Sequence, residues 1–411
     1  MKLKSYLLLA FLFALPLAQH SAAQEAERPH YSVLYTAWIK AGDPVATVRV
    51  RLTRHPEWVQ WMTFKADPER YTDFKGTGSI EVTDEGVHWV PPGEDAYLQF
   101  RVNLESRRAS GRFDGLVNDT WAIFRADDLV PPARVSMEDG TQSRAKLQLN
   151  LPKEWSVATP FPRYTSGRFR IDNPDRLFDR PTGWLVMGDI GTRIGTVGDT
   201  RVTVAAPKGQ SMRRMDMLAF LRWTLPTLQE LFPQFPGRLL IVGADDPMWR
   251  GALSAPDSLY VHSDRPLLSE NATSTLLHEI VHVAMGAKGA PDADWIVEGL
   301  AEYYSLEALL RSGTISEKRF LKAHADLVAW GERSGPLNSK RSSGAITARA
   351  VGVLREIDAE IRTASDGKHS LDDVVRQLSE EDKPITNQRF RELAMSAAGG
   401  NLRSMPAFTE E

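Results

Sequence analysis

The sequence predicts an α+β protein, because the spacing of its apolar residues changes from strand-like to helical about halfway along the chain. Its 411 residues, of which 42% are apolar and 25% charged, are typical of a globular protein with two or three domains. We therefore expect an N-terminal antiparallel β-sandwich-like domain over residues 24–207. A second domain is expected over residues 208–335, followed by a C-terminal helical region over residues 336–411.

Short segments rich in β-branched and aromatic residues predict the strands of the N-terminal domain. Residues that favour turns (Gly, Pro, Asp and Asn) separate these segments, which favours a sandwich of antiparallel strands. The expected strands span residues 31–40, 46–52, 59–65, 79–82, 96–104, 120–125 and 145–149. Their pattern does not indicate chemistry, so we expect the domain to be structural or to shape a substrate site.

Helical spacing predicts most of the elements that follow residue 207. We expect a helix over residues 215–232 that is interrupted at Pro226, because proline has no N–H to donate inside a helix. Two short apolar runs, residues 238–243 and 258–262, predict buried strands. Further helices are expected over residues 271–285, 293–312, 316–332, 345–364, 370–380 and 387–398, with a Ser/Gly/Lys-rich break at 334–344.

The first 23 residues have the pattern of an export signal. Lys2 and Lys4 precede an apolar run over residues 7–18, and small residues at 21–23 suit a cleavage site. The run is too short to span a membrane, so no stable membrane insertion is expected after cleavage. The chain has no cysteine, which fits the bacterial periplasm, or secretion, without disulfide bonds.

The overall charge argues against one class of partner. A formal net charge of −3 and a pI near 6.3 do not favour nucleic acid. The composition carries no signal about the oligomeric state.

The segment 278–282 (HEIVH) predicts a metal site. His278 and His282 are one helical turn apart, so both imidazoles point the same way from one helix. A catalytic zinc ion takes three protein ligands, and Glu298 on the next predicted helix would be the third. Glu302 is one turn beyond Glu298, where it could accept the second N–H of a ligand histidine. Glu279, between the histidines, could act as general base on an activated water.

The alternative is that these histidines are ordinary residues of a helix core. The strongly apolar helix around them, and two acidic residues spaced by four on the next helix, favour a metal. We therefore expect one Zn²⁺ ion as the cofactor.

The chain resembles the gluzincin metallopeptidases, and in particular the glycyl aminopeptidase family and the aminopeptidase N group. Residues 295–303 (WIVEGLAEY) follow the W-x-x-E-G-x-A-x-Y pattern of the second helix in that family, and residues 370–374 (SLDDV) are similar to a segment of its helical tail. The resemblance implies a thermolysin-like zinc catalytic domain over residues 208–335. It also implies His278, His282 and Glu298 as zinc ligands, with Glu279 as the base.

The sequence departs from the family in the strand that binds substrate. The segment that corresponds to this strand is Gly251, Ala252, Leu253 and Ser254, so Ser254 stands where the family has a glutamate that grips the free amino terminus. A serine cannot balance an ammonium charge. Strict aminopeptidase activity is therefore not expected.

The sequence also lacks the tyrosine whose hydroxyl stabilises the oxyanion in the family. The corresponding segment is residues 347–350 (TARA), with Thr347 at its start. Loss of one oxyanion donor typically removes about 3–4 kcal/mol of transition-state stabilisation. Tyr303, Tyr304 and His369 are candidate replacements, although each is also compatible with an ordinary core or surface position.

These features lead to three hypotheses, in decreasing order of preference. The first is an exported zinc metallopeptidase that hydrolyses peptides or proteins, with Glu279 as general base. The second is a catalytically impaired zinc-binding relative that acts as a binding or scaffold protein. The third is hydrolysis of a non-peptide amide, since the residue that anchors the substrate amine has changed.

Overall fold

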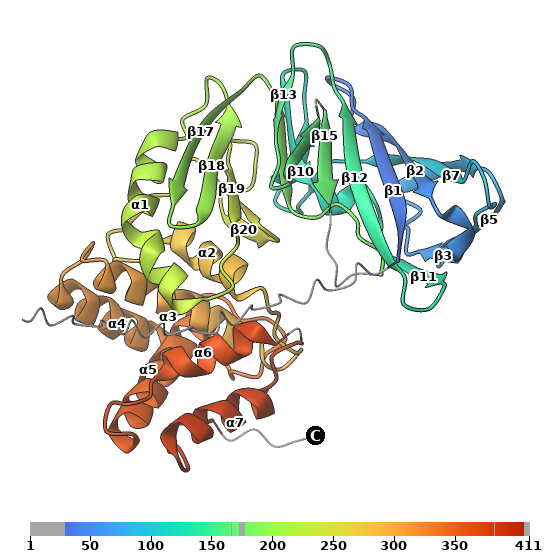
Figure 1. Cartoon of the computed structure of the whole chain (residues 1–411). Helices are drawn as coiled ribbons and strands as arrows, with labels where there is room; N and C mark the ends of the chain where they lie inside the picture. Colours follow the sequence, from blue (N-terminus) through green and yellow to red (C-terminus); the bar gives the residue numbers. More distant parts are fainter. Residues whose placement is uncertain (1–28, 166, 172–176, 382, 407–411) are drawn as a thin grey trace, which may run out of the picture.

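The computed structural model describes residues 29–165, 167–171, 177–381 and 383–406. The predicted export signal, residues 1–23, lies outside them. A β-rich N-terminal part lies beside a mixed sheet and a stack of helices (Figure 1). The predicted α+β class is confirmed. In the part of the chain that the structure describes, no helix is both long and apolar enough to span a membrane.

The N-terminal part contains a seven-stranded sheet in the order β14-β15-β12-β1-β2-β7-β4. Its strands are β1 (His30–Trp38), β2 (Val45–Arg54), β4 (Tyr71–Gly76), β7 (Tyr97–Asn103), β12 (Gln142–Asn150), β14 (Arg163–Thr165) and β15 (Arg168–Ile171). Buried and accessible residues alternate along β1, β2 and β12, as expected for a sheet with one face on a core and one toward solvent.

Among the described residues, this part contains two further sheets. One has the order β11-β3-β6-β5 and the other β13-β16-β10-β9-β8. Their strands are β3 (Val59–Phe64), β5 (Ser79–Thr83), β6 (Gly86–Val90), β8 (Ser106–Arg107), β9 (Phe113–Val117), β10 (Trp121–Arg125), β11 (Ala133–Met137), β13 (Ser156–Ala158) and β16 (Trp184–Gly188). Short 3-10 helices span Pro56–Trp58 and Ala126–Asp128.

The expectation of a wholly antiparallel sandwich is wrong at one pair of strands. β1 pairs with β12 in parallel, from His30 opposite Gln142 to Trp38 opposite Asn150. Parallel neighbours need a long crossover rather than a tight turn. Here the segment between the two strands contains β2, β4 and β7 of the same sheet, the whole sheet β11-β3-β6-β5, and β8 to β10 of the third sheet.

The mixed sheet beside the N-terminal part has the order β17-β18-β19-β21-β20. It contains β17 (Ile190–Val197), β18 (Thr200–Pro207), β19 (Arg238–Val242), β20 (Ala252–Ala255) and β21 (Ser258–Val261). Residues 190–207, which we expected to belong to the N-terminal domain, form β17 and β18 of this sheet, because β18 pairs in parallel with β19. The sheet therefore begins at Ile190, upstream of the boundary expected at residue 207.

Helix α1 (Arg214–Leu231) packs against β17 and β18 (Figure 1). The predicted interruption at Pro226 is wrong, since the helix runs through this residue. Leu221, Leu225 and Leu228 on the same helix are buried in the core. We attribute the continuity to this packing, which offsets the hydrogen bond that proline removes.

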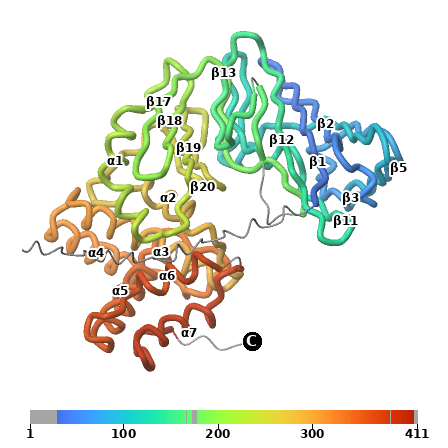
Figure 2. The backbone as a smooth tube through the Cα atoms, in the orientation of Figure 1, coloured from blue at the N-terminus to red at the C-terminus, as the bar shows by residue number. Residues whose placement is uncertain are grey.

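Within the described residues, six more helices follow, and each agrees with a predicted helix to within a few residues. They are α2 (Thr275–Met285), α3 (Asp294–Arg311), α4 (Glu317–Gly331), α5 (Ala345–Ala364), α6 (Leu371–Glu380) and α7 (Asn387–Ala398). One apolar core runs from α1 through α7, so the C-terminal helices share the core of α2 and α3. Figure 2 shows the backbone of these helices gathered in one half of the molecule. The expected boundary at residue 336 lies in the connection between α4 and α5.

A glycine sets the distance between α3 and α5. A Cβ added at Gly299 would lie 2.8 Å from Cβ of Ala350 and 2.9 Å from Cδ1 of Leu354. Both distances are shorter than ordinary van der Waals contact, so only glycine allows the two helices to approach this closely. Gly299 follows Glu298 directly, and the close packing therefore fixes the part of α3 that carries this carboxylate.

The β-rich part and the mixed sheet share an apolar interface. Ile123 and Trp184 of the first part pack with Leu240 and Tyr260 of the second in a separate buried cluster. The backbone N–H of Trp184 donates to Oγ of Ser258 at 2.8 Å, and its indole N–H donates to the carbonyl oxygen of Leu253 at 2.9 Å. Leu253 lies on β20, so the N-terminal part helps to hold this strand in place.

Candidate metal centre and cleft

Helix α2 presents both histidines from one face. Ser274 caps its N-terminus by accepting a hydrogen bond from the N–H of Leu277, and Gly286 ends it in the left-handed region with φ 64°. The opposite face, which includes Leu277 and Ile280, is buried in the core. The apolar face therefore fixes the orientation of the helix, and the two imidazoles point away from the core.

Helix α3 brings a carboxylate to these imidazoles. Nε2 of His278 lies 3.1 Å from Nε2 of His282. The two carboxylate oxygens of Glu298 lie 3.5 Å from these nitrogens, one from each. We call His278, His282 and Glu298 the metal-ligand cluster; among the described residues, this is the group of His and acidic side chains whose spacing suits a metal ion.

The distances within the metal-ligand cluster fit a tetrahedral zinc ion. Ligand atoms about 2.0–2.1 Å from such an ion lie roughly 3.3–3.4 Å from one another. The observed separations of 3.1 Å and 3.5 Å fall close to this value. The donor set, two imidazole nitrogens and one carboxylate oxygen, is also one that catalytic zinc uses, and it leaves a fourth position open.

Glu302 lies where the sequence places it, one turn beyond Glu298. Its Oε2 is 3.0 Å from Nδ1 of His278, which leaves Nε2 of that ring directed at the cluster. A carboxylate in this position fixes the tautomer and orientation of a ligand histidine.

The carboxylates favour positive charge at the cluster. Burial lowers the pKa of the His278 imidazole, but hydrogen bonds to Glu298 and Glu302 outweigh it and raise the pKa to about 10. Burial raises the pKa of Glu298, whereas hydrogen bonds from His278 and His282 hold it well below its usual range. The same field that holds a proton here would stabilise a divalent cation.

Two cavities meet at the metal-ligand cluster. The larger, of about 1110 Å³, is lined by both histidines, Glu279 and Glu298. The smaller, of about 350 Å³, is lined by His278, Glu279, Glu298 and Glu302. Glu279 therefore lines both cavities. A group that exchanges protons with a bound substrate must be accessible in this way.

This fold is similar to that of an aminopeptidase N family protein. The crystal structure of that protein, from Idiomarina loihiensis, superposes with a TM-score of 0.66 at 17% sequence identity. The similarity covers 85% of this chain and 70% of that chain. No family model and no curated protein matches the sequence. At this identity, the similarity shows the fold.

The structure places the expected substrate strand beside the cluster. Ala252, Leu253 and Ser254 line the larger cavity, and Gly251 and Ala252 line the smaller one. All but Gly251 belong to β20, the last strand of its sheet, so one edge of the strand has no partner strand within the described residues.

The three candidate replacements for the missing tyrosine lie elsewhere. The hydroxyl of Tyr303 donates to Asp358, and that of Tyr304 donates to Asp372. Both rings are buried in the helical core, and neither tyrosine is among the residues that line the two cavities. His369 lies before α6 and does not line them either. The proposed roles of these three residues are therefore wrong.

Thr347, by contrast, lines the smaller cavity together with Glu279. The structure thus brings the segment that lacks the family tyrosine to the cluster. A threonine is much shorter than a tyrosine, so its hydroxyl cannot reach as far into the cavity from the same backbone position.

Sequence reasoning missed several residues of the cleft. Trp249 lines both cavities, and Trp330 lines the smaller one. Arg125 and Arg180 reach the larger cavity from the N-terminal part. These residues come from separate elements and have no common spacing, so no local pattern connects them to the metal motif.

Proposed function

We propose that this chain is a zinc-dependent metallopeptidase that hydrolyses peptide bonds in peptides or proteins. The observation that carries the proposal is the convergence of His278, His282 and Glu298 within 3.1–3.5 Å, beside Glu279 in an open cleft. The similarity of the fold to an aminopeptidase N family protein supports it.

The residues of the cleft would divide the chemistry among them. When bound, zinc supplies Lewis-acid activation of water and of the scissile carbonyl. Glu279 would accept a proton from the attacking water and deliver it to the leaving amine. Glu302 would keep His278 in the tautomer that directs Nε2 at the cluster.

β20 would bind an extended peptide. Its free edge offers backbone hydrogen bonds of the kind that extended peptides use when they add to a sheet. Ser254 offers no negative charge for a free amino terminus. We therefore propose cleavage that does not require this group, and no strict aminopeptidase activity.

The decisive experiment compares the wild-type protein with Glu279→Gln. Both are expected to bind one zinc ion, measured by elemental analysis, because the ligands are unchanged. Only the wild type should cleave a peptide library, and the variant should lose activity by about 10²–10⁴-fold. Equal rates for the two proteins would rule out Glu279 as the base.

Thr347 and Ser254 favour a second candidate, a zinc-binding relative without catalytic activity. The same experiment separates the two, since this candidate predicts bound zinc and no cleavage by the wild type. Sustained cleavage that a chelator abolishes would exclude it. Cell-wall peptides and other amides belong in the library, because the altered amine anchor also fits a non-peptide amide.

We also propose that the protein is exported, on the basis of residues 1–23. Fractionation of the producing cells should place the protein in the periplasm or the medium, with a mature N-terminus near residue 24. A cytoplasmic protein with an intact leader would contradict this.

A further inference from the structure

The smaller cavity at the metal-ligand cluster has two tryptophans in its lining, Trp249 and Trp330. Leu327, Ala252 and Ala348 line it as well. Its volume is about 350 Å³, against about 1110 Å³ for the larger cavity. A small space with aromatic and aliphatic side chains in its wall therefore lies directly beside the proposed reaction centre.

Trp330 is accessible in this wall. It is 44% exposed at the end of α4, and in the described part of the chain no hydrogen bond or ring contact involves its indole. A Cβ added at Gly344 would lie 3.3 Å from Cζ2 of Trp330, so the indole packs over the backbone where α5 begins. Large apolar side chains that stay accessible in a concave site are typical of ligand binding.

Trp249 is held in place largely by the N-terminal part. The guanidinium of Arg108 lies 3.7 Å from the centre of its ring, and Nε of Arg108 donates to the carboxylate of Asp114 at 2.7 Å. The backbone N–H of Trp249 donates to the carbonyl oxygen of Phe113 at 2.8 Å. A Cβ added at Gly251 would overlap the indole, so the ring lies directly against this glycine. These contacts fix the indole before a substrate arrives, which lowers the cost of binding.

The boundary between the two cavities lies at the metal centre. The residues that line both cavities are Trp249, Ala252, His278, Glu279 and Glu298. On the segment that contains β20, Gly251 lines only the smaller cavity and residues 253–255 line only the larger one. A peptide bound along β20 would therefore pass from one cavity to the other beside the cluster, at about 3.3 Å per residue. A side chain next to the scissile bond would enter the smaller cavity.

The two cavities differ in their charged residues. Outside the metal centre, Arg265 is the charged residue among the described residues that line the smaller cavity, and its Nε donates to the carbonyl oxygen of Arg250 at 2.8 Å. The corresponding residues of the larger cavity are Arg125, Asp127, Arg180, Asp257, Lys288 and Asp294. A charged side chain of a substrate thus has more partners in the larger cavity, and an apolar side chain is better accommodated in the smaller one.

We propose that the smaller cavity binds a large apolar side chain of the substrate against Trp249 and Trp330. Such a side chain gains free energy by leaving water, and an aromatic one can also make edge-to-face contacts with an indole. This assignment rests on the proposed peptidase function and narrows its substrate class. The substrates would be peptides with phenylalanine, leucine or methionine at one of the two positions that flank the cleaved bond.

The cleavage sites that the wild type selects in a peptide library provide the first test. Replacing the preferred phenylalanine by alanine should lower kcat/KM by roughly 10–100-fold. Trp330→Ala should reduce this ratio by about tenfold, and Trp330→Phe should restore most of it. The matched control is Trp223→Ala, which removes a tryptophan that is 67% exposed on α1 and lines neither cavity. It should keep the wild-type ratio within about twofold.

Binding without turnover provides the second test. Zinc-loaded Glu279→Gln protein is titrated calorimetrically with a seven-residue Gly/Ser peptide that has one central phenylalanine, and with its alanine counterpart. The phenylalanine peptide should bind at least about tenfold more tightly. Adding Trp330→Ala to this variant should remove most of the difference.

The two tests separate the substrate preference from the proposed function. If the wild type cleaves no peptide but the phenylalanine peptide binds in this Trp330-dependent way, the apolar site stands and the peptidase function is wrong. If the wild type cleaves peptides without a large apolar residue beside the bond, or Trp330→Ala keeps the preference, the apolar site is wrong and the function stands. Selection of an acidic residue would assign recognition to Arg265 and would also overturn the apolar site.

Discussion

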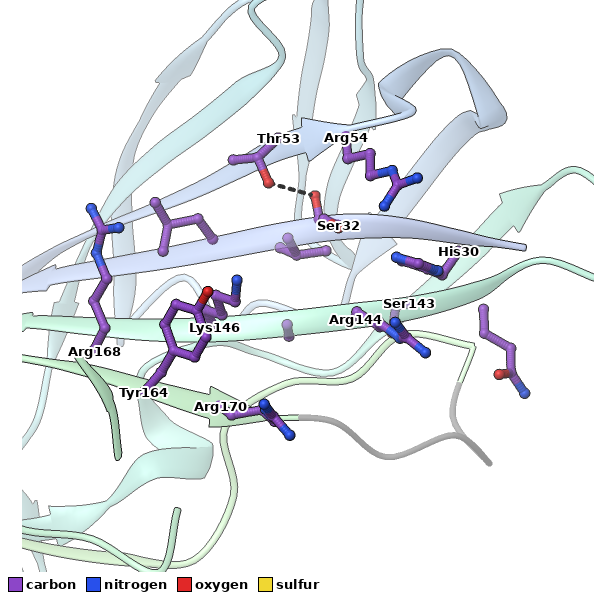
Figure 3. Close-up of a pocket in the computed structure, with 14 residues that line it drawn as sticks. His30, Ser32, Thr53, Arg54, Ser143, Arg144, Lys146, Tyr164, Arg168 and Arg170 are labelled. Atoms are coloured by element: carbon purple, nitrogen blue, oxygen red, sulfur yellow. Dashed lines mark hydrogen bonds between the residues drawn. The ribbon is translucent and has the colours of Figure 1, made fainter. Parts of the chain in front are cut away.

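The metal-ligand cluster differs in its charges from the basic pocket on the seven-stranded sheet (Figure 3), which is lined by Arg54, Arg144, Lys146, Arg168 and Arg170. In the cluster, acidic and imidazole groups from two packed helices lie within 3.5 Å of one another, and their side chains are only 13–29% exposed. In the basic pocket, Lys146 and Arg170 face each other across a sheet with the same sign of charge. The cluster is a set of complementary groups that one cation would complete, whereas the described residues that line the pocket include five cations and no acidic residue.

This difference also separates what each group contributes to the fold. The groups of the cluster satisfy one another, and their positions are set by close helix packing. The cations of the pocket stand on the solvent side of strands whose other face makes the core. Removing a charge should therefore disturb the first site much more than the second. Three variants test this contrast, and Gly299→Ala tests the helix packing that positions the cluster.

Glu298→Ala should have the largest effect. It removes the carboxylate that α3 brings to the two histidines, which is the third ligand of the proposed zinc ion. We expect zinc affinity to fall by more than about 100-fold, since even loss of a supporting carboxylate costs 10–100-fold. Competition with a chromophoric chelator measures the change. Unchanged affinity would mean that the carboxylate does not bind the metal.

Glu302→Gln should have the next largest effect. The amide cannot hold the Nδ1 proton of His278 as strongly as a carboxylate does, so zinc affinity should fall by about 10–100-fold. The matched control is Glu317→Gln, at an exposed position on α4, which should leave the affinity unchanged. An equal loss in the two variants would point to net charge instead of tautomer control.

Gly299→Ala tests the packing that positions the cluster. The added methyl group would overlap Ala350 and Leu354, and overpacking of this kind typically costs about 1–3 kcal/mol. The higher helix propensity of alanine offsets up to about 1 kcal/mol of this cost. We therefore expect the free energy of unfolding, measured in urea, to fall by about 1–2 kcal/mol.

Gly352→Ala is the matched control on α5, because its added Cβ would lie 3.4 Å from Val328, an ordinary contact. This variant should be as stable as the wild type or slightly more so. If both variants behaved alike, the close approach of α3 and α5 would not be the cause.

The smallest effect is expected in the basic pocket. The double variant Lys146→Gln, Arg168→Gln removes two charges but no carboxylate contact, so the free energy of unfolding should change by less than about 0.5 kcal/mol. Urea unfolding checks this. A loss above about 2 kcal/mol would show that these side chains support the sheet, and the contrast between the two sites would fail.

The two sites also differ in how far sequence could predict them. His278 and His282 are separated by one helical turn, and Glu298 and Glu302 repeat the same spacing on the next helix, so local periodicity suffices. The basic pocket depends on strand register. Lys146 and Arg170 are adjacent only because β15 turns back onto β12, which no local pattern encodes.

The same limit explains the errors in the fold. Helices α2 to α7 depend on local spacing and capping, and their positions were predicted closely. β18 belongs to the mixed sheet because it pairs with β19, and the whole of α1 separates these two strands in the sequence. The continuity of α1 through Pro226 depends on burial against that sheet. Both are tertiary effects that outweigh a local preference.

The indole N–H of Trp184 donates a hydrogen bond to the carbonyl oxygen of Leu253. The apolar interface around this tryptophan limits how the two halves of the gene can evolve. A gene fragment for either half would yield a polypeptide that exposes its apolar side of this interface, which chaperones and proteases in the cell would recognise. Recombination could therefore not exchange one half for an unrelated module without also replacing the residues around this tryptophan. The two halves should be inherited together.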